Sequence, residues 1–159
     1  MNTKNVNWSK IVSELIVGIT GGVIFGILDF VTRMNYAGDY GCTPIIDNLF
    51  GTRGYESCGA FGALAGVVIG SLIGIILIYR TSLQKNQYKK ITISSALSII
   101  IFPLTIGMIL FWPPFEDGDL LLVLPVIPIF ILISLVPSLL ITSLLNWKQF
   151  LTSLRFWYS

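Results

Sequence analysis

Four long apolar stretches fill most of the chain, and they constrain its fold more than any other feature. They run over residues 11–31, 59–79, 91–112 and 120–145. Each holds about 20 residues or more, the length that a helix rising about 1.5 Å per residue needs to cross about 30 Å of hydrocarbon. A helix also satisfies its backbone hydrogen-bonding groups within its own segment, as hydrocarbon requires. The sequence therefore predicts an all-α integral membrane protein, a single-domain bundle of four transmembrane helices.

The composition disfavours the other fold classes. The chain is 54% hydrophobic and only 11% charged, with a mean hydropathy of +0.82, whereas about a quarter of the residues in a soluble domain are charged. A membrane β-barrel would alternate apolar and polar residues over segments of about ten residues. The longest connection, 32–58, is too short to fold independently, so no soluble domain is expected.

Charged residues between the apolar stretches are sorted by sign. Eight of the ten Lys and Arg lie before the first stretch, in the connection 80–90 or in the tail 146–159: Lys4, Lys10, Arg80, Lys85, Lys89, Lys90, Lys148 and Arg155. Seven of the eight carboxylates lie in or beside the connection 32–58 and the turn 113–119: Asp29, Asp39, Asp47, Glu56, Glu116, Asp117 and Asp119. Because cytoplasmic loops carry the excess of Lys and Arg, we expect both termini in the cytoplasm and a plasma or inner membrane as the location.

Both cysteines, Cys42 and Cys58, lie in the connection expected outside the cytoplasm. Two cysteines confined to such a loop predict a structural disulfide. The alternative is a redox-active pair, but such pairs are usually close in sequence, as in C-x-x-C, and have a lowered thiol pKa. Fifteen residues separate these two, and the chain has no histidine to activate either.

The same outer connection predicts a short helix over residues 44–50. Thr43 and Pro44 form an N-cap and first-turn pair, and Gly51 supplies a left-handed stop. Apolar residues recur between them at helical spacing, so we expect one face of this helix to lie on the bundle or on the lipid interface. The disulfide and helix would form a stabilising lid; a docking surface for a partner is the alternative.

Glycine recurs at every fourth position in the first two apolar stretches. The glycines concerned are Gly18, Gly22 and Gly26, followed by Gly62, Gly66, Gly70 and Gly74. Small residues four apart share one helix face and let two backbones approach closely. The pattern predicts packing of the first two helices through these faces as a glycine zipper, with a homo-oligomeric seam or contact with another subunit as alternatives. By contrast, Ile76 and Ile131 are expected to face lipid.

Other polar groups have structural explanations. Lys10 with Glu14, and Asp29 with Arg33, are favourable pairs four residues apart on a helix. The acidic turn at 116–119 suits the start of the fourth helix and supplies too few ligands for a dedicated calcium site, so no metal is predicted. From Trp147 onward, aromatic and basic residues predict a C-terminal amphipathic segment lying in the cytoplasmic interface.

The absence of a catalytic constellation shapes the functional prediction. The sequence contains no histidine, thiolate cluster, phosphate-binding loop or nucleophile elbow. We therefore expect a non-catalytic accessory or assembly subunit of a larger membrane protein complex, which packs through the glycine-rich faces of the first two helices. A small homo-oligomeric channel or transporter is the alternative. An enzyme, with the cysteine pair as its only candidate centre, ranks third. No cofactor is predicted, although the apolar surface could hold lipid or pigment; the expected partners are the bilayer and other membrane subunits, not nucleic acid.

Overall fold

All regular structure in the described part of the chain is helical. The computed structural model describes residues 8–51, 54–81, 85–110 and 120–147. Within them lie α1 (Trp8–Tyr40), α2 (Pro44–Phe50), α3 (Tyr55–Arg80), α4 (Lys85–Leu110) and α5 (Leu120–Leu145). The helices α1, α3, α4 and α5 are long and apolar enough to cross a membrane, which confirms the prediction of four such segments. The acidic turn at 116–119 and the amphipathic segment after Trp147 lie outside the described residues.

Helix α1 is longer than its apolar stretch and continues nine residues past Val31, to Tyr40. No proline lies between residues 32 and 40, and Arg33 binds Asp29 across one turn at 3.1 Å. The helix ends where Gly41 adopts a φ of 77° and donates its backbone N–H to the Ala37 carbonyl at 2.8 Å. A left-handed glycine is a common way to end a helix, because it needs no Cβ there.

The short helix α2 has the bounds that its flanking residues predict. Pro44 occupies the first turn, and Gly51 closes the helix with a φ of 67° and an N–H bond to the Asp47 carbonyl. Thr43 makes no side-chain cap hydrogen bond, so the proline and the glycine define this helix. Two of its apolar side chains, Ile45 and Leu49, are 80% and 71% exposed. Ile46 and Phe50 are half-buried, and α2 contacts α3.

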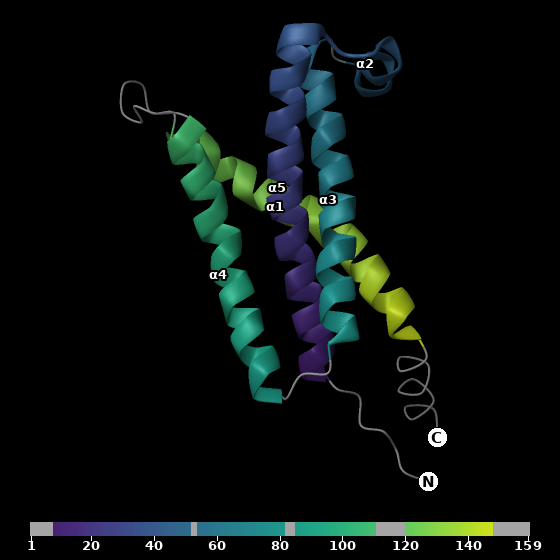
Figure 1. The fold of residues 1–159 in the computed structure, drawn as a ribbon, viewed down its shortest axis with the longest axis vertical. Helices are drawn as coiled ribbons and strands as arrows, with labels where there is room; N and C mark the ends of the chain where they lie inside the picture. Colours follow the sequence, from purple (N-terminus) through teal and green to yellow (C-terminus); the bar gives the residue numbers. More distant parts are fainter. Residues whose placement is uncertain (1–7, 52–53, 82–84, 111–119, 148–159) are drawn as a thin grey trace.

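Helix α1 is the centre of the arrangement, and α3, α4 and α5 all pack against it. Helix α3 runs alongside α1, α5 crosses the pair obliquely, and α4 stands to one side (Figure 1). The apolar core consists of Ile19, Val23, Ile27, Val67 and Phe130. Burial is uneven, because 56% of the α1 span is buried in the chain but only 6% of the α4 span.

The two residues expected to face lipid behave differently. Ile76 on α3 is 36% exposed, in line with that expectation. Ile131 on α5 is half-buried and packs against the apolar core, so the expectation was wrong there. The oblique crossing of α5 brings Ile131 toward the other helices, and hydropathy alone cannot reveal such a crossing.

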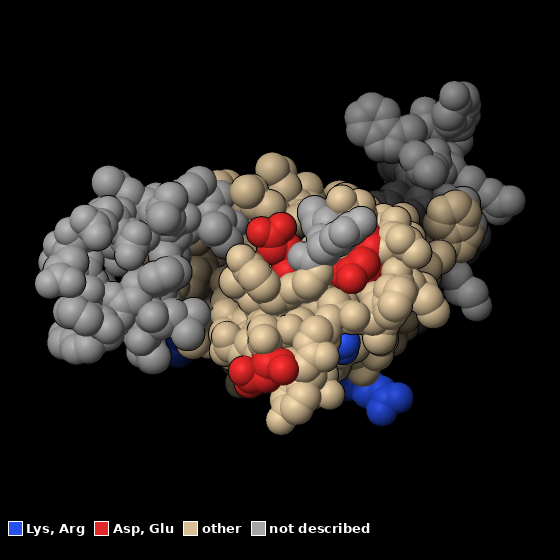
Figure 2. Space-filling model, turned by 90° about the horizontal axis from the view of Figure 1, so that it is seen from above, with Lys and Arg blue, Asp and Glu red and all other residues tan. Residues whose placement is uncertain are grey.

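The two ends of the helices differ in charge. One end, called the basic end below, carries Lys10, Arg80, Lys89 and Lys90. The opposite end, called the disulfide end, carries Asp39, Asp47 and Glu56. A view down onto the disulfide end shows acidic side chains spread over its surface (Figure 2).

Candidate functional site: a buried polar line between α1 and α5

A line of polar side chains runs along one face of α5, a helix that is otherwise strongly apolar. Ser134, Ser138, Thr142 and Asn146 follow one another at intervals of four residues, and Asn146 extends the last turn of the helix. Residues four apart lie on the same helix face. All four are buried, with exposed fractions of 0%, 0%, 4% and 1%. Polar groups inside a membrane helix usually face protein, and this line follows that rule.

Glycines on α1 make room for the upper part of the line. A Cβ added at Gly22 would lie 2.8 Å from the Ser134 hydroxyl oxygen and 2.6 Å from that of Ser71 on α3. Ser134 donates to the Phe130 carbonyl at 2.6 Å, and Ser138 donates to Ser71 at 3.3 Å. The hydroxyls therefore fill space that any larger residue on α1 would occupy.

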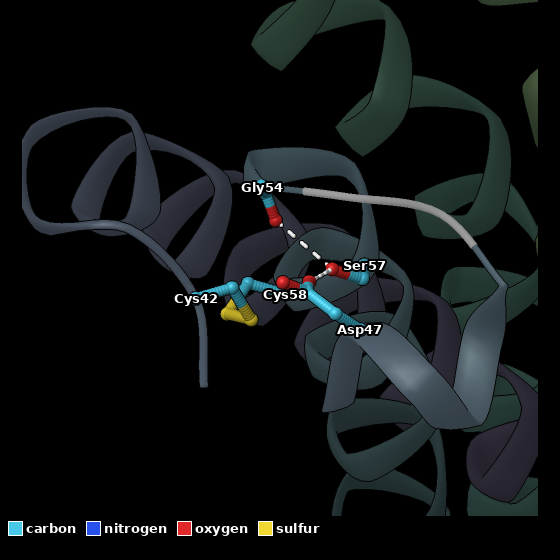
Figure 3. The surroundings of a disulfide bond; sticks show 5 residues. All are labelled: Cys42, Asp47, Gly54, Ser57 and Cys58. Carbon is cyan, nitrogen blue, oxygen red and sulfur yellow. Dashed lines mark hydrogen bonds between the residues drawn. A yellow bond between two sulfur atoms is a disulfide. The ribbon is translucent and has the colours of Figure 1, made fainter. Parts of the chain in front are cut away.

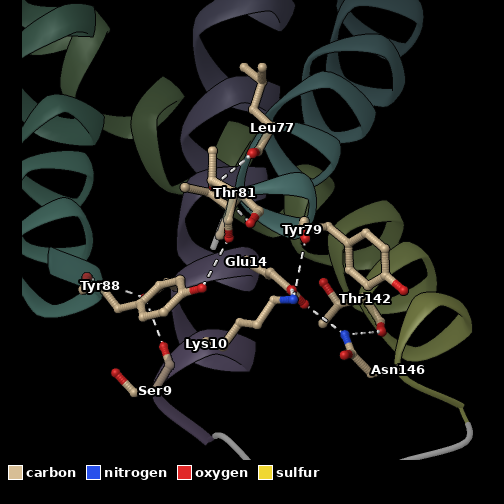
Figure 4. Close-up of polar contacts among 11 residues, drawn as sticks. Ser9, Lys10, Glu14, Leu77, Tyr79, Thr81, Tyr88, Thr142 and Asn146 are labelled. Atoms are coloured by element: carbon tan, nitrogen blue, oxygen red, sulfur yellow. Dashed lines mark hydrogen bonds and ion pairs between the residues drawn. The ribbon is translucent and has the colours of Figure 1, made fainter. Parts of the chain in front are cut away.

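The line ends at a buried carboxylate near the basic end (Figure 4). Glu14 on α1 is fully buried and accepts a hydrogen bond from the Asn146 side-chain amide at 2.6 Å. The same amide donates to the Thr142 carbonyl at 3.0 Å. The Lys10 ammonium lies 3.7 Å from the other Glu14 oxygen, 3.3 Å from the Tyr79 carbonyl oxygen and 4.6 Å from the centre of the Tyr79 ring. One carboxylate thus joins α1 to α5, while its lysine reaches α3.

Three buried atoms of this cluster lack a hydrogen-bond partner: Glu14 Oε1, Thr142 Oγ1 and Asn146 Oδ1. Leaving a buried polar atom without a hydrogen bond costs about 1–3 kcal/mol, and at Glu14 Oε1 the Lys10 ion pair at 3.7 Å offsets part of this cost. A water molecule with two to four polar partners commonly satisfies atoms of this kind. Chemically, the cluster can therefore hold water and anchor helices by hydrogen bonds.

The sequence indicated only part of this site. The spacing of Lys10 and Glu14 predicts their ion pair, which the structure contains. It does not predict that Glu14 is buried, nor that Asn146, assigned to the cytoplasmic tail, is its partner. The available signal was the four-residue spacing of polar residues on α5, which continues one helical face down to Asn146.

A second side of α1 binds α4 through hydroxyl groups. Ser13 lies 2.8 Å from the Thr92 hydroxyl and donates to the Tyr88 carbonyl at 3.2 Å. Two turns further along the same side of α1, Thr20 donates to the Ser95 carbonyl at 3.2 Å. These contacts attach the basic half of α4 to α1, whereas most of its surface stays uncovered.

The third side of α1 meets the glycines of α3 at backbone distance. Each of these glycines faces the backbone carbonyl of one α1 residue: Gly62 faces Asp29, Gly66 faces Phe25, Gly70 faces Gly21 and Gly74 faces Val17. A Cβ at Gly62 would lie 2.7 Å from the Asp29 oxygen, and one at Gly74 2.6 Å from the Val17 oxygen. Each step of four residues up α3 matches a step of four down α1, so the pair has one antiparallel register. The α1 glycines Gly18, Gly22 and Gly26 face side chains of α3 and α5 instead.

The disulfide end contains the predicted Cys42–Cys58 bond, whose Cα atoms lie 5.7 Å apart (Figure 3). It connects the segment after α1 to the first turn of α3. Ser57 adds two hydrogen bonds there, one to the Asp47 carboxylate on α2 and one to the Gly54 carbonyl at 3.0 Å. The bond and these contacts fix α2 against the start of α3.

The described residues contain no group of three or more His, Cys, Asp or Glu side chains that could hold a metal ion. No protein-family model matches the chain, and neither a curated protein nor a solved structure matches it significantly. The site must therefore be interpreted from its own chemistry.

Proposed function

We propose that the protein is a non-catalytic accessory or assembly subunit of a larger membrane protein complex, and that α4 packs against the partner. The observation that carries this proposal is the low burial of α4, 6% of its span against 44% for α3. Helix α4 touches the rest of the chain along one side, mainly through α1. Its other sides are free to contact another protein within the membrane.

The exposed surface of α4 also contains hydroxyl side chains, which a surface in contact with lipid alone does not need. Ser94, Ser98 and Thr105 stand four and seven residues apart and share one side of the helix. Ser98 and Thr105 donate to carbonyls of their own helix, at 3.0 and 2.8 Å, and Ser94 and Thr105 are exposed. Small and hydroxyl residues are enriched where membrane helices meet, because they allow close approach and hydrogen bonding.

The glycines are not part of this proposed partner surface. Those of α3 face the α1 backbone, and those of α1 face α3 and α5. Added side chains would collide within the chain itself. A homo-oligomeric pore lined by these glycines would require α1 and α3 to separate. We therefore assign the glycines to packing within the chain.

We further propose that the basic end faces the cytoplasm. The support is the charge difference between the ends, with Lys10, Arg80, Lys89 and Lys90 at one and Asp39, Asp47 and Glu56 at the other. This orientation places the Cys42–Cys58 bond outside the cytoplasm, where disulfides persist. It suits a plasma membrane or a bacterial-type inner membrane.

Mild detergent extraction followed by mass spectrometry of co-purifying chains tests the accessory role. The wild-type chain is expected to bring discrete membrane proteins with it. Ser94→Leu adds bulk on the exposed side of α4 and should reduce their recovery, whereas Ser143→Leu makes the same change at an exposed serine of α5 and should not. Purification of the wild type alone, or only as a self-oligomer, would reject the accessory role.

The buried line ending at Glu14 favours a second candidate, transport of a small cation or proton by a homo-oligomer. A buried ionisable residue in a membrane helix is a common feature of such pathways. In proteoliposomes, this candidate predicts an ion flux that Glu14→Gln abolishes while the chain stays folded. The accessory role predicts no flux from either protein.

A further inference from the structure

A crevice of about 390 Å³ opens at the basic end between α1 and α4. Trp8 and Val12 of α1 line one wall, and Asn86, Lys89 and Ile93 of α4 line the other. This crevice lies beside the Ser13–Thr92 contact and is separate from the buried line, which lies between α1 and α5. The crevice is therefore a second candidate site, located at the basic end of the described part of the chain.

The walls of the crevice change character with depth. Trp8, Asn86 and Lys89 lie in the first two turns of their helices, at the basic end. Val12 and Ile93 lie four residues further along, which is about 6 Å deeper at 1.5 Å per residue. Both are about half exposed, at 45% and 52%. The crevice thus has a polar mouth above an apolar slot that is open to the surrounding hydrocarbon.

The charge at the mouth is positive. Among the described residues that line the crevice, Lys89 alone is charged, and Lys90 follows it on the same helix. Helix α4 begins at Lys85, so the positive end of its dipole lies at the same level. Basic pockets between membrane helices commonly bind anionic lipid headgroups.

We propose that this crevice binds one anionic phospholipid from the leaflet at the basic end. The phosphate lies beside Lys89 and Asn86, and an acyl chain follows Val12 and Ile93 toward the centre of the membrane. A zwitterionic lipid would offer the same acyl chains but no net charge for Lys89. A free phosphate ion would use only the mouth and leave the apolar slot unfilled.

Native mass spectrometry of the delipidated protein with added phosphatidylglycerol or phosphatidylcholine tests the headgroup. We expect one phosphatidylglycerol to be retained in preference to phosphatidylcholine. Lys89→Gln should lower that retention roughly fivefold, the effect of one lysine near an anionic headgroup. Lys90→Gln removes the same charge one residue away, outside the lining, and should leave retention within about twofold. Equal loss in both variants would mean diffuse attraction and would overturn the site.

A second pair of variants tests the apolar slot without changing charge. Ile93→Trp fills the slot and should reduce retention of phosphatidylglycerol, whereas Leu97→Trp, one turn deeper and 54% exposed, should not. Displacement of the lipid by millimolar inorganic phosphate would identify a headgroup-only anion site and overturn the lipid assignment. Equal retention of phosphatidylcholine would overturn it as well.

Discussion

Replacing Gly70 by alanine tests the close contact of α1 and α3 most sharply. The added Cβ would lie 2.7 Å from the carbonyl carbon of Gly21 and closer still to its oxygen. The obstacle is backbone, so no side-chain rotation can relieve it. Gly38→Ala is the matched control, because it makes the same change in α1 at a position with no atom within 4 Å of the new Cβ.

The expected loss follows from the distance that the helices must move. Ordinary contact begins at 3.4 Å, so the 2.7 Å approach to the Gly21 carbonyl carbon alone requires the helices to separate by at least roughly 0.7 Å, and the closer oxygen requires more. A gap of that size removes about a quarter to a half of each dispersion contact of about 0.1–0.2 kcal/mol. Over roughly 20 to 40 atom pairs along the seam, these factors give a loss of about 0.5–4 kcal/mol, which brackets the loss of about 1–3 kcal/mol typical of overpacking.

Reversible unfolding in mixed detergent micelles, followed by circular dichroism, measures the difference. Gly70→Ala is expected to lower the free energy of unfolding by about 1–3 kcal/mol. Gly18→Ala should also lower it, because the Cβ there meets the Ile75 side chain at 2.7 Å, and this β-branched side chain is fully buried. Gly38→Ala should lie within about 0.5 kcal/mol of the wild type. If Gly70→Ala were as stable as Gly38→Ala, the backbones would not be in contact at this register.

Three further predictions concern the two ends. Asn146→Leu removes the hydrogen-bond donor to a buried Glu14 oxygen and should lower the free energy of unfolding by about 1–3 kcal/mol. Ser143→Leu is the control and should change this free energy little in the same assay. Equal effects of the two substitutions would mean that Glu14 does not depend on Asn146. Reduction of the Cys42–Cys58 bond should lower it by about 3 kcal/mol through loop entropy, and an unchanged unfolding curve after reduction would contradict a stabilising role. After reduction, an impermeant thiol reagent on intact cells should label both cysteines; labelling only after permeabilisation would reverse the proposed orientation.

Local chemistry accounts for the features that the sequence predicts well. The bounds of α2 follow from Pro44 and Gly51, because a proline fits the first turn and a left-handed glycine ends a helix. The four apolar stretches predict the membrane-spanning helices by length alone. The Cys42–Cys58 bond follows from the presence of just two cysteines in one short connection.

Features set by contacts between distant residues were not predictable in the same way. Glu14 and Asn146 are 132 residues apart, and only the crossing of α1 by α5 brings them together. Hydropathy does not predict the extension of α1 to Tyr40, because residues 32–40 are mostly polar or aromatic and lie outside the apolar stretch. The helix ends at Gly41, whose left-handed backbone conformation is not described by a hydropathy scale.

The proposed partner surface on α4 can be tested directly in native membranes. A photo-crosslinking amino acid at Ser94 would report what lies against the exposed side of α4, and one at Leu77, 62% exposed on α3, is the control. We expect a discrete protein adduct when the crosslinker replaces Ser94 and no protein adduct when it replaces Leu77. An adduct of twice the 17.6 kDa mass of one chain, or no protein adduct from position 94, would contradict the assignment of this chain as an accessory subunit.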